Sequence, residues 1–270
     1  MMSEKRTIST NQLYWKPEKQ DPFILEHVES TFEKGYIYGI IGPNGSGKTS
    51  LIRNLLRLVE PSSGSVELDG ENIQSIKRKH LARKMAMVPQ HTGMDSTFCA
   101  YDIVMMGRAP YQKRFADAGV QDKEIVKEAM QITDCYQFRE KEVSLLSGGE
   151  IQRVATARAI AQDTDWLILD EPTASLDVRH QVALMESLVG LKENQNKSVI
   201  IILHDINIAS EYCDRIVMMK DGTIYSQGDT KEVLTCENLE ETYGIAFHLI
   251  MEPDTGKRYF MPAGKRGGTL

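Results

Sequence analysis

The chain has 270 residues, of which 41% are hydrophobic and 26% are charged, a composition that excludes general disorder and allows a large core. Its 32 basic and 38 acidic side chains leave a net charge of −6, which argues against broad, charge-driven binding of nucleic acid. Because no apolar run reaches the roughly 18 residues of a membrane span, we expect a soluble cytoplasmic chain that can lie against a membrane partner. Four cysteines without a CxxC pair indicate reduced thiols rather than a zinc or redox motif.

The first third of the chain alternates strands with helices. Alternating or continuous apolar residues predict strands over Thr7–Trp15, Ile24–Phe32 and Tyr36–Ile41. A glycine-rich turn follows the third strand, and a helix is expected over Lys48–Leu58. The next expected elements are a strand, a basic helix and another strand, at Ser65–Asp69, Lys77–Lys84 and Met85–Val88.

The middle of the chain is different, because Asp102–Gln162 has a mainly helical pattern that indicates an insertion between two halves of a sheet domain. One helical face is expected to carry Ile125, Val126, Ala129 and Met130. Beyond the insertion, the continuous apolar runs Trp166–Leu169 and Val199–Leu203 are typical of parallel strands buried on both faces. A hairpin is predicted over residues 215–227, with a type I′ turn at Asp221-Gly222. The whole pattern predicts an α/β fold.

The strongest motif is a phosphate loop between an apolar strand and an apolar-periodic helix. It matches G-x-x-x-x-G-K-[ST] and consists of Gly42, Pro43, Asn44, Gly45, Ser46, Gly47, Lys48 and Thr49. Glycines let successive backbone N–H groups converge on phosphate oxygens at a helix N-terminus. Lys48 adds a positive charge for the β- and γ-phosphates, and the Thr49 hydroxyl suits Mg²⁺. The motif predicts nucleotide binding, but alone it does not separate kinases, GTPases, helicases and transport ATPases.

Two acids end the apolar strand Trp166–Leu169. Asp170 stands where a carboxylate can hold Mg²⁺, and Glu171 stands where a carboxylate can orient an attacking water near the γ-phosphate. A pair of acids after a strand is also a common structural feature of α/β proteins. Following a phosphate loop, the pair favours hydrolysis by water, because kinases and GTPases often lack the second acid.

A helix start at Ser147 is unusual for its glycines. Ser147 and Glu150 have the spacing of a capping box, which explains both residues structurally. The box does not explain Gly148 and Gly149, since glycines in a first turn lower helix stability. Exposed glycine N–H groups at a helix N-terminus suit an anionic ligand. Because the phosphate loop already holds one nucleotide, we interpret this surface as serving the nucleotide of another copy.

Five motifs occur in the order found in the nucleotide-binding subunits of ABC transporters, which the chain resembles from about Thr7 to Tyr243. They are the phosphate loop, Gln90, Leu146-Ser-Gly-Gly-Glu150, Leu169-Asp-Glu-Pro172 and His204. The resemblance implies a P-loop NTPase (RecA-like) core sheet with an antiparallel β subdomain and an inserted helical signature subdomain at about residues 95–163. It implies an ATPase domain over residues 1–245 and a C-terminal tail over residues 246–270.

The same resemblance implies a set of roles in binding and hydrolysing ATP with Mg²⁺. Gln90 becomes a Mg²⁺ ligand and a sensor of the membrane partner, and His204 becomes a switch that reaches the γ-phosphate. Ser50 joins the nucleotide-binding residues, and Ser175-Leu176-Asp177 becomes a loop in which Asp177 crosses a dimer interface. Adenine is expected to stack on Tyr14 or Trp15, and the sequence leaves that choice open.

The resemblance also implies partners: a second ATPase copy, an integral membrane permease, and indirectly an extracytoplasmic substrate-binding protein. We expect a peripheral protein at the cytoplasmic face of the membrane, docked through residues 90–101 and the helical insertion, with Met94, Phe98, Met105 and Met106 as apolar contacts. Residues 102–111 and 253–262 resemble importers of iron–siderophore, haem and vitamin B12. Ferric siderophore import is preferred, with haem, cobalamin, zinc or manganese import as alternatives. A soluble non-transport ABC ATPase and a P-loop kinase are the readings from other classes.

Overall fold

The structure is a computed structural model that describes residues 6–264 apart from 19, 91–96, 113–117 and 175. The chain divides into two compact units that alternate along the sequence. The first unit comprises residues 1–7, 33–36 and 67–201, and the second comprises residues 8–32, 37–66 and 202–270. No helix in the described ranges has the length and apolarity needed to cross a bilayer.

The first unit combines a parallel three-stranded array with a group of helices. In chain order its elements are β5 (Glu71–Asn72), α2 (Arg78–Leu81), β6 (Met85–Val88), α3 (Ala100–Met105), η1 (Met106–Arg108), α4 (Val120–Ile132), η2 (Tyr136–Phe138), η3 (Val143–Leu145), α5 (Gly148–Ala161), β7 (Trp166–Leu169), α6 (Val178–Gln195) and β8 (Ser198–Ile202). Strand β7 pairs in parallel with β6 on one side and with β8 on the other. All residues of β7 and β8 are buried, as their continuous apolar runs predicted.

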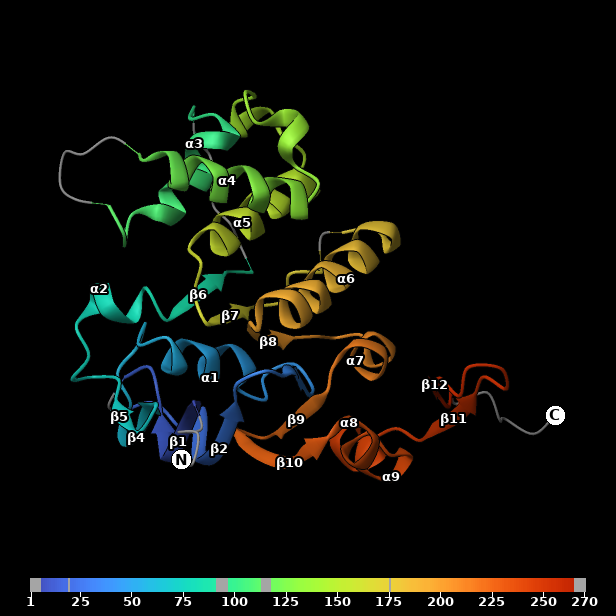
Figure 1. The fold of residues 1–270 in the computed structure, drawn as a ribbon. Coiled ribbons are helices and arrows are strands. Elements are labelled where there is room, and N and C mark those ends of the chain that lie inside the picture. The colour runs from blue at the N-terminus through green and yellow to red at the C-terminus, as the bar shows by residue number, and fades with distance from the viewer. Residues whose placement is uncertain (1–5, 19, 91–96, 113–117, 175, 265–270) are drawn as a thin grey trace, which may run out of the picture. The chain divides into compact units, whose positions relative to one another are not determined.

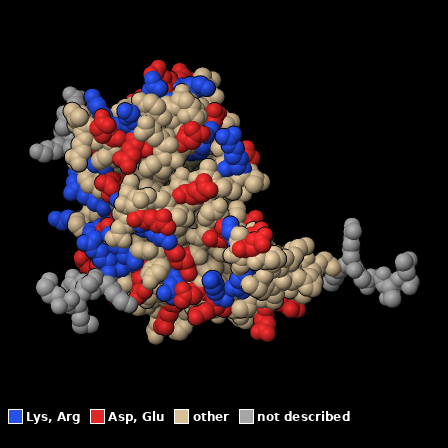
Figure 2. All heavy atoms as spheres, turned by 45° about the vertical axis from the view of Figure 1, so that its right-hand side comes forward, with Lys and Arg blue, Asp and Glu red and all other residues tan. Residues whose placement is uncertain are grey.

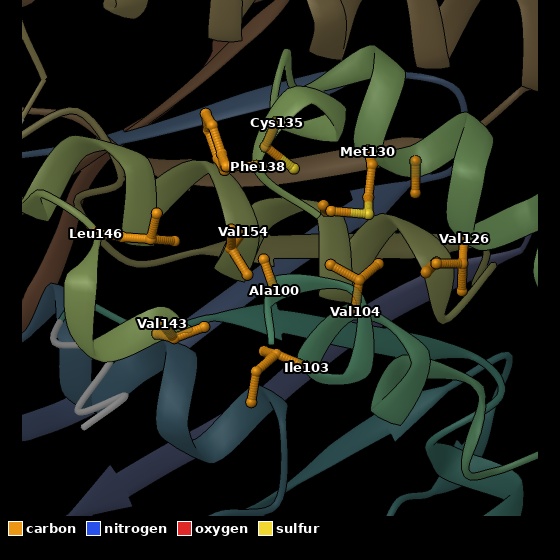
Figure 3. Packing of buried hydrophobic residues seen from close by; sticks show 13 residues of the cluster. Ala100, Ile103, Val104, Val126, Met130, Cys135, Phe138, Val143, Leu146 and Val154 are labelled. Carbon is orange, nitrogen blue, oxygen red and sulfur yellow. The ribbon is translucent and has the colours of Figure 1, made fainter. Parts of the chain in front are cut away.

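The predicted helical insertion is present and has its own core. Helices α3, α4 and α5 pack against one another (Figure 1). Their shared cluster is drawn in Figure 3, where Val104, Met130 and Val154 point toward one another from the three helices. The predicted apolar face of α4 is confirmed, since Val126, Ala129 and Met130 are buried and Ile125 packs against the cluster.

The second unit carries the remaining strands. Its elements are β1 (Thr7–Trp15), β2 (Leu25–Glu33), β3 (Ile37–Ile41), α1 (Lys48–Leu55), β4 (Ser63–Leu68), α7 (Ile206–Tyr212), β9 (Arg215–Lys220), β10 (Thr223–Asp229), α8 (Thr230–Val233), α9 (Cys236–Tyr243), β11 (Phe247–Met251) and β12 (Arg258–Pro262), of which β1, β2 and β4 each run into the first unit at one end. One sheet has the order β2-β1-β4, and in another β9 lies parallel to β3 and antiparallel to β10. Asp221 and Gly222 have φ values of 46° and 78°, as the predicted type I′ turn requires.

The largest differences from the sequence predictions concern three elements. The helix expected to reach Leu58 ends at Leu55, because Arg57 adopts a left-handed φ of 54°. The expected basic helix is shortened to α2. The C-terminal tail, for which no structure was predicted, forms the β11–β12 hairpin, and the Phe260 N–H donates a 2.7 Å hydrogen bond to Asn207 Oδ1.

Basic and acidic side chains are mixed over the face shown in Figure 2.

Candidate functional site

The phosphate loop follows the fully buried strand β3. The backbone conformation of the loop requires glycine at several positions. Gly42, Gly45 and Gly47 have φ values of 149°, 82° and 96°, which side chains with a Cβ rarely adopt. A Cβ at Gly42 would lie 2.2 Å from the Met219 carbonyl oxygen, and one at Gly47 would lie 2.7 Å from a methyl of Leu25. The second unit therefore fixes the loop in a shape that only glycine permits at these positions.

Lys48 begins α1 and lies over this loop with only 5% of its surface exposed. Its ammonium donates hydrogen bonds of 2.8 and 2.9 Å to the carbonyl oxygens of Gly42 and Pro43. The Ser46 hydroxyl oxygen is buried and has no hydrogen-bond partner among the described residues. Thr49 and Ser50 are half-buried in the first turn of α1. A buried cation, an unsatisfied hydroxyl and the N-terminus of a helix together suit a polyphosphate.

Gly42 is also contacted by a residue that sequence analysis missed. Tyr243, at the end of α9, makes a hydrogen bond with the Gly42 backbone. Burial of the ring raises the pKa of Tyr243 to about 12, so its hydroxyl stays protonated at physiological pH. No motif connects two residues this far apart in the chain, so the sequence offered no signal for this support of the loop.

The two acids predicted at the end of β7 lie in the first unit. Asp170 is 3% exposed, and its N–H donates to the Val88 carbonyl of β6. Glu171 adopts a left-handed φ of 50°, an uncommon conformation that costs on the order of 1–3 kcal/mol and is concentrated at functional sites. Its Oε2 accepts a 2.6 Å hydrogen bond from Nε2 of Gln90.

The strand register explains the pairing of Gln90 with Glu171. Val88 of β6 is the partner of Leu169 of β7, so residues two positions beyond each strand lie side by side. The amide therefore holds the Glu171 carboxylate by one oxygen. The structure thus brings together two residues that sequence analysis had assigned to separate motifs.

The signature segment, residues 146–150, starts α5 with the predicted capping box. Ser147 Oγ accepts a hydrogen bond from the Glu150 N–H, and the Glu150 carboxylate accepts 2.8 Å bonds from the Ser147 N–H and hydroxyl. These bonds, the backbone one first, lower the pKa of the Glu150 carboxyl. Gly148 is exposed, and a Cβ built on it would meet no atom within 4 Å. The packing of the described residues therefore does not require a glycine at this position.

Asp177 and His204, two further predicted site residues, both lie at the surface. Asp177 is the exposed N-cap of α6 and accepts hydrogen bonds from the His180 N–H and ring, and the first of these lowers the pKa of its carboxyl. Its predicted neighbour Ser175 lies outside the described residues. His204 is exposed just beyond β8, and the N–H of the preceding Leu203 donates to the Ile40 carbonyl oxygen.

The two aromatic candidates for adenine stacking, Tyr14 and Trp15, are both half-buried at the end of β1. Tyr14 packs edge-on against Phe23, with ring centroids 5.5 Å apart, and Phe23 itself is 41% exposed. The packing explains why this stretch is aromatic and does not select either ring for adenine. Gly149, predicted with Gly148 to face a nucleotide, is half-buried in the first turn of α5.

The donors assigned to Mg²⁺ fit a hard cation by their chemistry. Thr49 offers a hydroxyl, Gln90 an amide and Asp170 a buried carboxylate, and oxygen ligands of these kinds are those that Mg²⁺ prefers. The described residues contain no group of three His, Cys, Asp or Glu side chains that could hold a metal by themselves.

The strand, phosphate loop and helix, together with the parallel strands, define a P-loop NTPase. Residues 25–174 match the model of the ABC transporter family. The petrobactin import ATP-binding protein FpuD of Bacillus anthracis is 36% identical over 245 residues, 91% of this chain and 90% of that protein. The ferric enterobactin transport ATP-binding protein FepC of Escherichia coli is 36% identical over 242 residues, 90% and 89% of the two chains.

Solved structures give the same result. A chain of an inward-facing transporter described as of metal-chelate type superposes with a TM-score of 0.83 at 25% identity, covering 96% of this chain and 98% of that one. A dimeric ATP-binding cassette in a post-hydrolysis state, bound to ADP and Pi, has a TM-score of 0.74 at 26% identity, covering 83% and 98%. The chain belongs to the ABC transporter family, and it is an ATP-hydrolysing member of that family.

Proposed function

We propose that this chain is the ATPase subunit of an importer that takes up ferric siderophores. The observation that carries the proposal is similarity over nine-tenths of the chain to ATP-binding proteins named for import of petrobactin and transport of ferric enterobactin. The predicted resemblance of residues 102–111 to such importers points the same way. Haem and cobalamin, and behind them zinc or manganese, are the competing substrates.

The chemistry proposed for the site is hydrolysis of the γ-phosphate of ATP by water. Lys48, the loop N–H groups and Ser46 would bind the phosphates, with Thr49 and Ser50 in the first helical turn. Glu171 would accept a proton from the attacking water. The 2.6 Å hydrogen bond from Gln90 would hold the Glu171 carboxylate in place. His204 and Lys48 would stabilise charge that develops on the γ-phosphate. Mg²⁺, held by Thr49, Gln90 and Asp170, would supply neutralisation of phosphate charge.

A second copy of the chain would complete each ATP site. The nucleotide bound to the phosphate loop of one copy would contact four residues of the other copy: Ser147, Gly148, Gly149 and Glu150. Asp177 would lie at the dimer interface. Support comes from the open space over Gly148, which leaves room for a ligand that this chain does not provide. The γ-phosphate would join the two copies, and hydrolysis would release them.

A membrane permease would dock on the first unit and receive this motion, with an extracytoplasmic binding protein delivering the substrate. Phe98 and Met106 support the proposed surface, because 55% and 45% of these apolar residues are exposed. Met105 is better explained as part of the helical core, against which it packs. Met94, the fourth residue predicted there, lies outside the described residues. We propose that the chain is held by this permease at the cytoplasmic face of the membrane.

Uptake of iron tests the substrate. Cells that lack this gene would be complemented with the wild-type chain or with Glu171→Gln, and loaded with a radiolabelled ferric siderophore or with labelled cobalamin. Iron uptake restored by the wild type and not by Glu171→Gln is the expected result. Restored cobalamin uptake without iron uptake would replace the substrate and leave the ATPase in place.

A further inference from the structure

The β11–β12 hairpin at the end of the second unit carries a group of exposed apolar side chains. Their exposed fractions run from 39% to 60%, and they are Ile245, Leu249, Ile250, Met251, Tyr259 and Met261. Contiguous apolar surface of this kind marks an interaction site. A two-stranded sheet is also only marginally stable in water, so pairing with a further strand would stabilise the hairpin.

The pairing of the two strands fixes the direction of the backbone groups of β11. Glu252, directly after β11, donates its N–H to the carbonyl oxygen of its cross-strand neighbour Lys257 at 2.9 Å. In an antiparallel pair successive residues direct their N–H and carbonyl groups to opposite edges, so those of Leu249 and Met251 point away from β12. Within the described part of the chain these groups have no hydrogen-bond partner. The outer edge of β11 is therefore open.

The opposite edge of the hairpin, on β12, is already covered by α7. The Asn207 amide accepts from the Phe260 N–H at 2.7 Å and donates to the Phe260 carbonyl oxygen at 3.4 Å. The Ser210 hydroxyl donates to the Arg258 carbonyl oxygen at 3.2 Å. A further strand can thus join the hairpin only beside β11.

Strand β11 lacks the features by which proteins protect an open strand edge. Its sequence is Phe-His-Leu-Ile-Met, without a lysine, a proline or an acid. Open edges usually carry such residues, because unpaired backbone groups beside apolar side chains pair with another strand. The edge of β11 is therefore suited to β-augmentation, in which a strand from another chain extends the sheet.

We propose that β11 pairs with β11 of a second copy of this chain, in a four-stranded sheet with the order β12-β11-β11-β12. An antiparallel strand pair has two-fold symmetry, so an open edge is complementary to the same edge of an identical strand. With the axis at Ile250, the backbone groups of Leu249 meet those of Met251 in the second copy. The same register sets His248 opposite Glu252, so that an imidazole faces the carboxylate.

So small a contact is weak between free chains, because interfaces below about 1,200 Å² are typical of transient complexes. A dimeric cassette is among the solved structures that this chain resembles. Two copies held in one transporter would have a millimolar effective concentration for each other, and a weak contact would then persist without ATP. This last consequence rests on the proposed function, whereas the pairing itself does not.

A cysteine at the symmetry axis tests the pairing. Ile250→Cys would be made in the full-length chain with Cys99→Ser and Cys236→Ser, which remove the two partly exposed thiols. Excess Mg·ADP would keep any γ-phosphate from joining the copies. Ile250 and its counterpart form a non-hydrogen-bonded pair with Cα atoms about 4.5 Å apart, which a disulfide can span. Mild oxidation should therefore give a linked dimer.

Tyr259→Cys is the matched control. Tyr259 lies opposite Ile250 on β12 and is similarly exposed, at 39% against 46%. In the four-stranded sheet, however, the two copies of this residue are three strand spacings or about 14 Å apart, so linkage should be at least about tenfold lower. Leu249→Pro, added to Ile250→Cys, removes an N–H that the hairpin itself does not use, and should abolish linkage without changing the thermal midpoint.

Sedimentation velocity at high protein concentration gives a second readout, in which the wild type should self-associate and Leu249→Pro should not. Equal linkage of Ile250→Cys and Tyr259→Cys would overturn the proposal, as would linkage that survives Leu249→Pro. Absence of both linkage and self-association would also overturn it, and would leave the edge of β11 to another partner, such as a permease segment.

Discussion

The phosphate loop and the signature segment are both glycine-rich helix starts, but their glycines have different causes. In the phosphate loop, positive φ values and a backbone oxygen 2.2 Å from a new Cβ at Gly42 explain why this chain has glycine there. At Gly148 no atom of the described residues comes this near, and the capping box of Ser147 and Glu150 already accounts for the helix start. Contacts within the chain explain the glycine at position 42. Gly148 needs an explanation from outside the chain, and the proposed contact with a partner's nucleotide would provide one.

Removing the Glu171 carboxylate should have the largest effect, because it concerns the reaction itself. Glu171→Gln should bind ATP normally and hydrolyse it about 10²–10⁴-fold more slowly, since general-base catalysis contributes that much. Steady-state ATPase assays and ATP-binding titrations give the two values. Glu240→Gln, an exposed acid of the second unit, is the control. Turnover at the wild-type rate in Glu171→Gln would remove Glu171 from the role of base.

Alanine at each glycine tests the comparison directly. Gly42→Ala should lose several kcal/mol of stability, because overpacking against the Met219 carbonyl adds to strain at φ 149°. Gly148→Ala should gain about 0.4–1 kcal/mol, since alanine suits a helix better. Denaturant unfolding measures both. ATPase activity should fall in Gly148→Ala despite its greater stability; full activity there would mean that no ligand approaches this residue.

The cap itself should matter less for stability than Gly42. Ser147→Ala should destabilise the chain by about 1 kcal/mol, because the N–H of Glu150 loses its acceptor. Ser144→Ala, an exposed serine in the preceding turn, is the matched control and should be neutral. Equal effects of the two substitutions in urea unfolding would show that the capping box contributes nothing.

The smallest expected effect is that of the Glu150 carboxylate on how stability depends on pH. The folded pKa of Glu150 is lowered, so its carboxylate stabilises the fold above its ordinary pKa of 4.5, and this contribution is lost as pH falls through the folded value. Wild type should therefore exceed Glu150→Gln in stability at pH 7, and the difference should shrink as the pH falls below 4.5. A difference in unfolding midpoint that is constant over this range would contradict the role of the carboxylate.

The sequence predicted the local features best. Continuous apolar runs located β7 and β8, and the Thr7–Trp15 strand has its predicted bounds. What it missed depends on residues far apart in the chain. The pairing of Gln90 with Glu171 needs the register of β6 on β7, and the β11–β12 hairpin is anchored by Phe260 on Asn207.

The part of the sequence that suggested an importer subgroup has a packing role in the structure. A Cβ at Gly107 would lie 2.3 Å from the Arg158 carbonyl oxygen, and Arg108 is buried in an ion pair with Asp122 at 2.8 Å. The packing of these residues holds the helical insertion together. The predicted domain boundaries at residues 245 and 246 stay a prediction.

Mixing two inactive variants tests the shared ATP site most directly. Chains carrying Lys48→Ala and chains carrying Ser147→Arg would be combined in a Glu171→Gln background, and ATP retained after gel filtration would be measured. If each site uses the loop of one copy and the signature segment of the other, a mixed dimer keeps one intact site. The mixture should then retain up to one ATP per mixed dimer, while neither variant alone retains any. A mixture that retains no more ATP than its separate components would contradict the shared site.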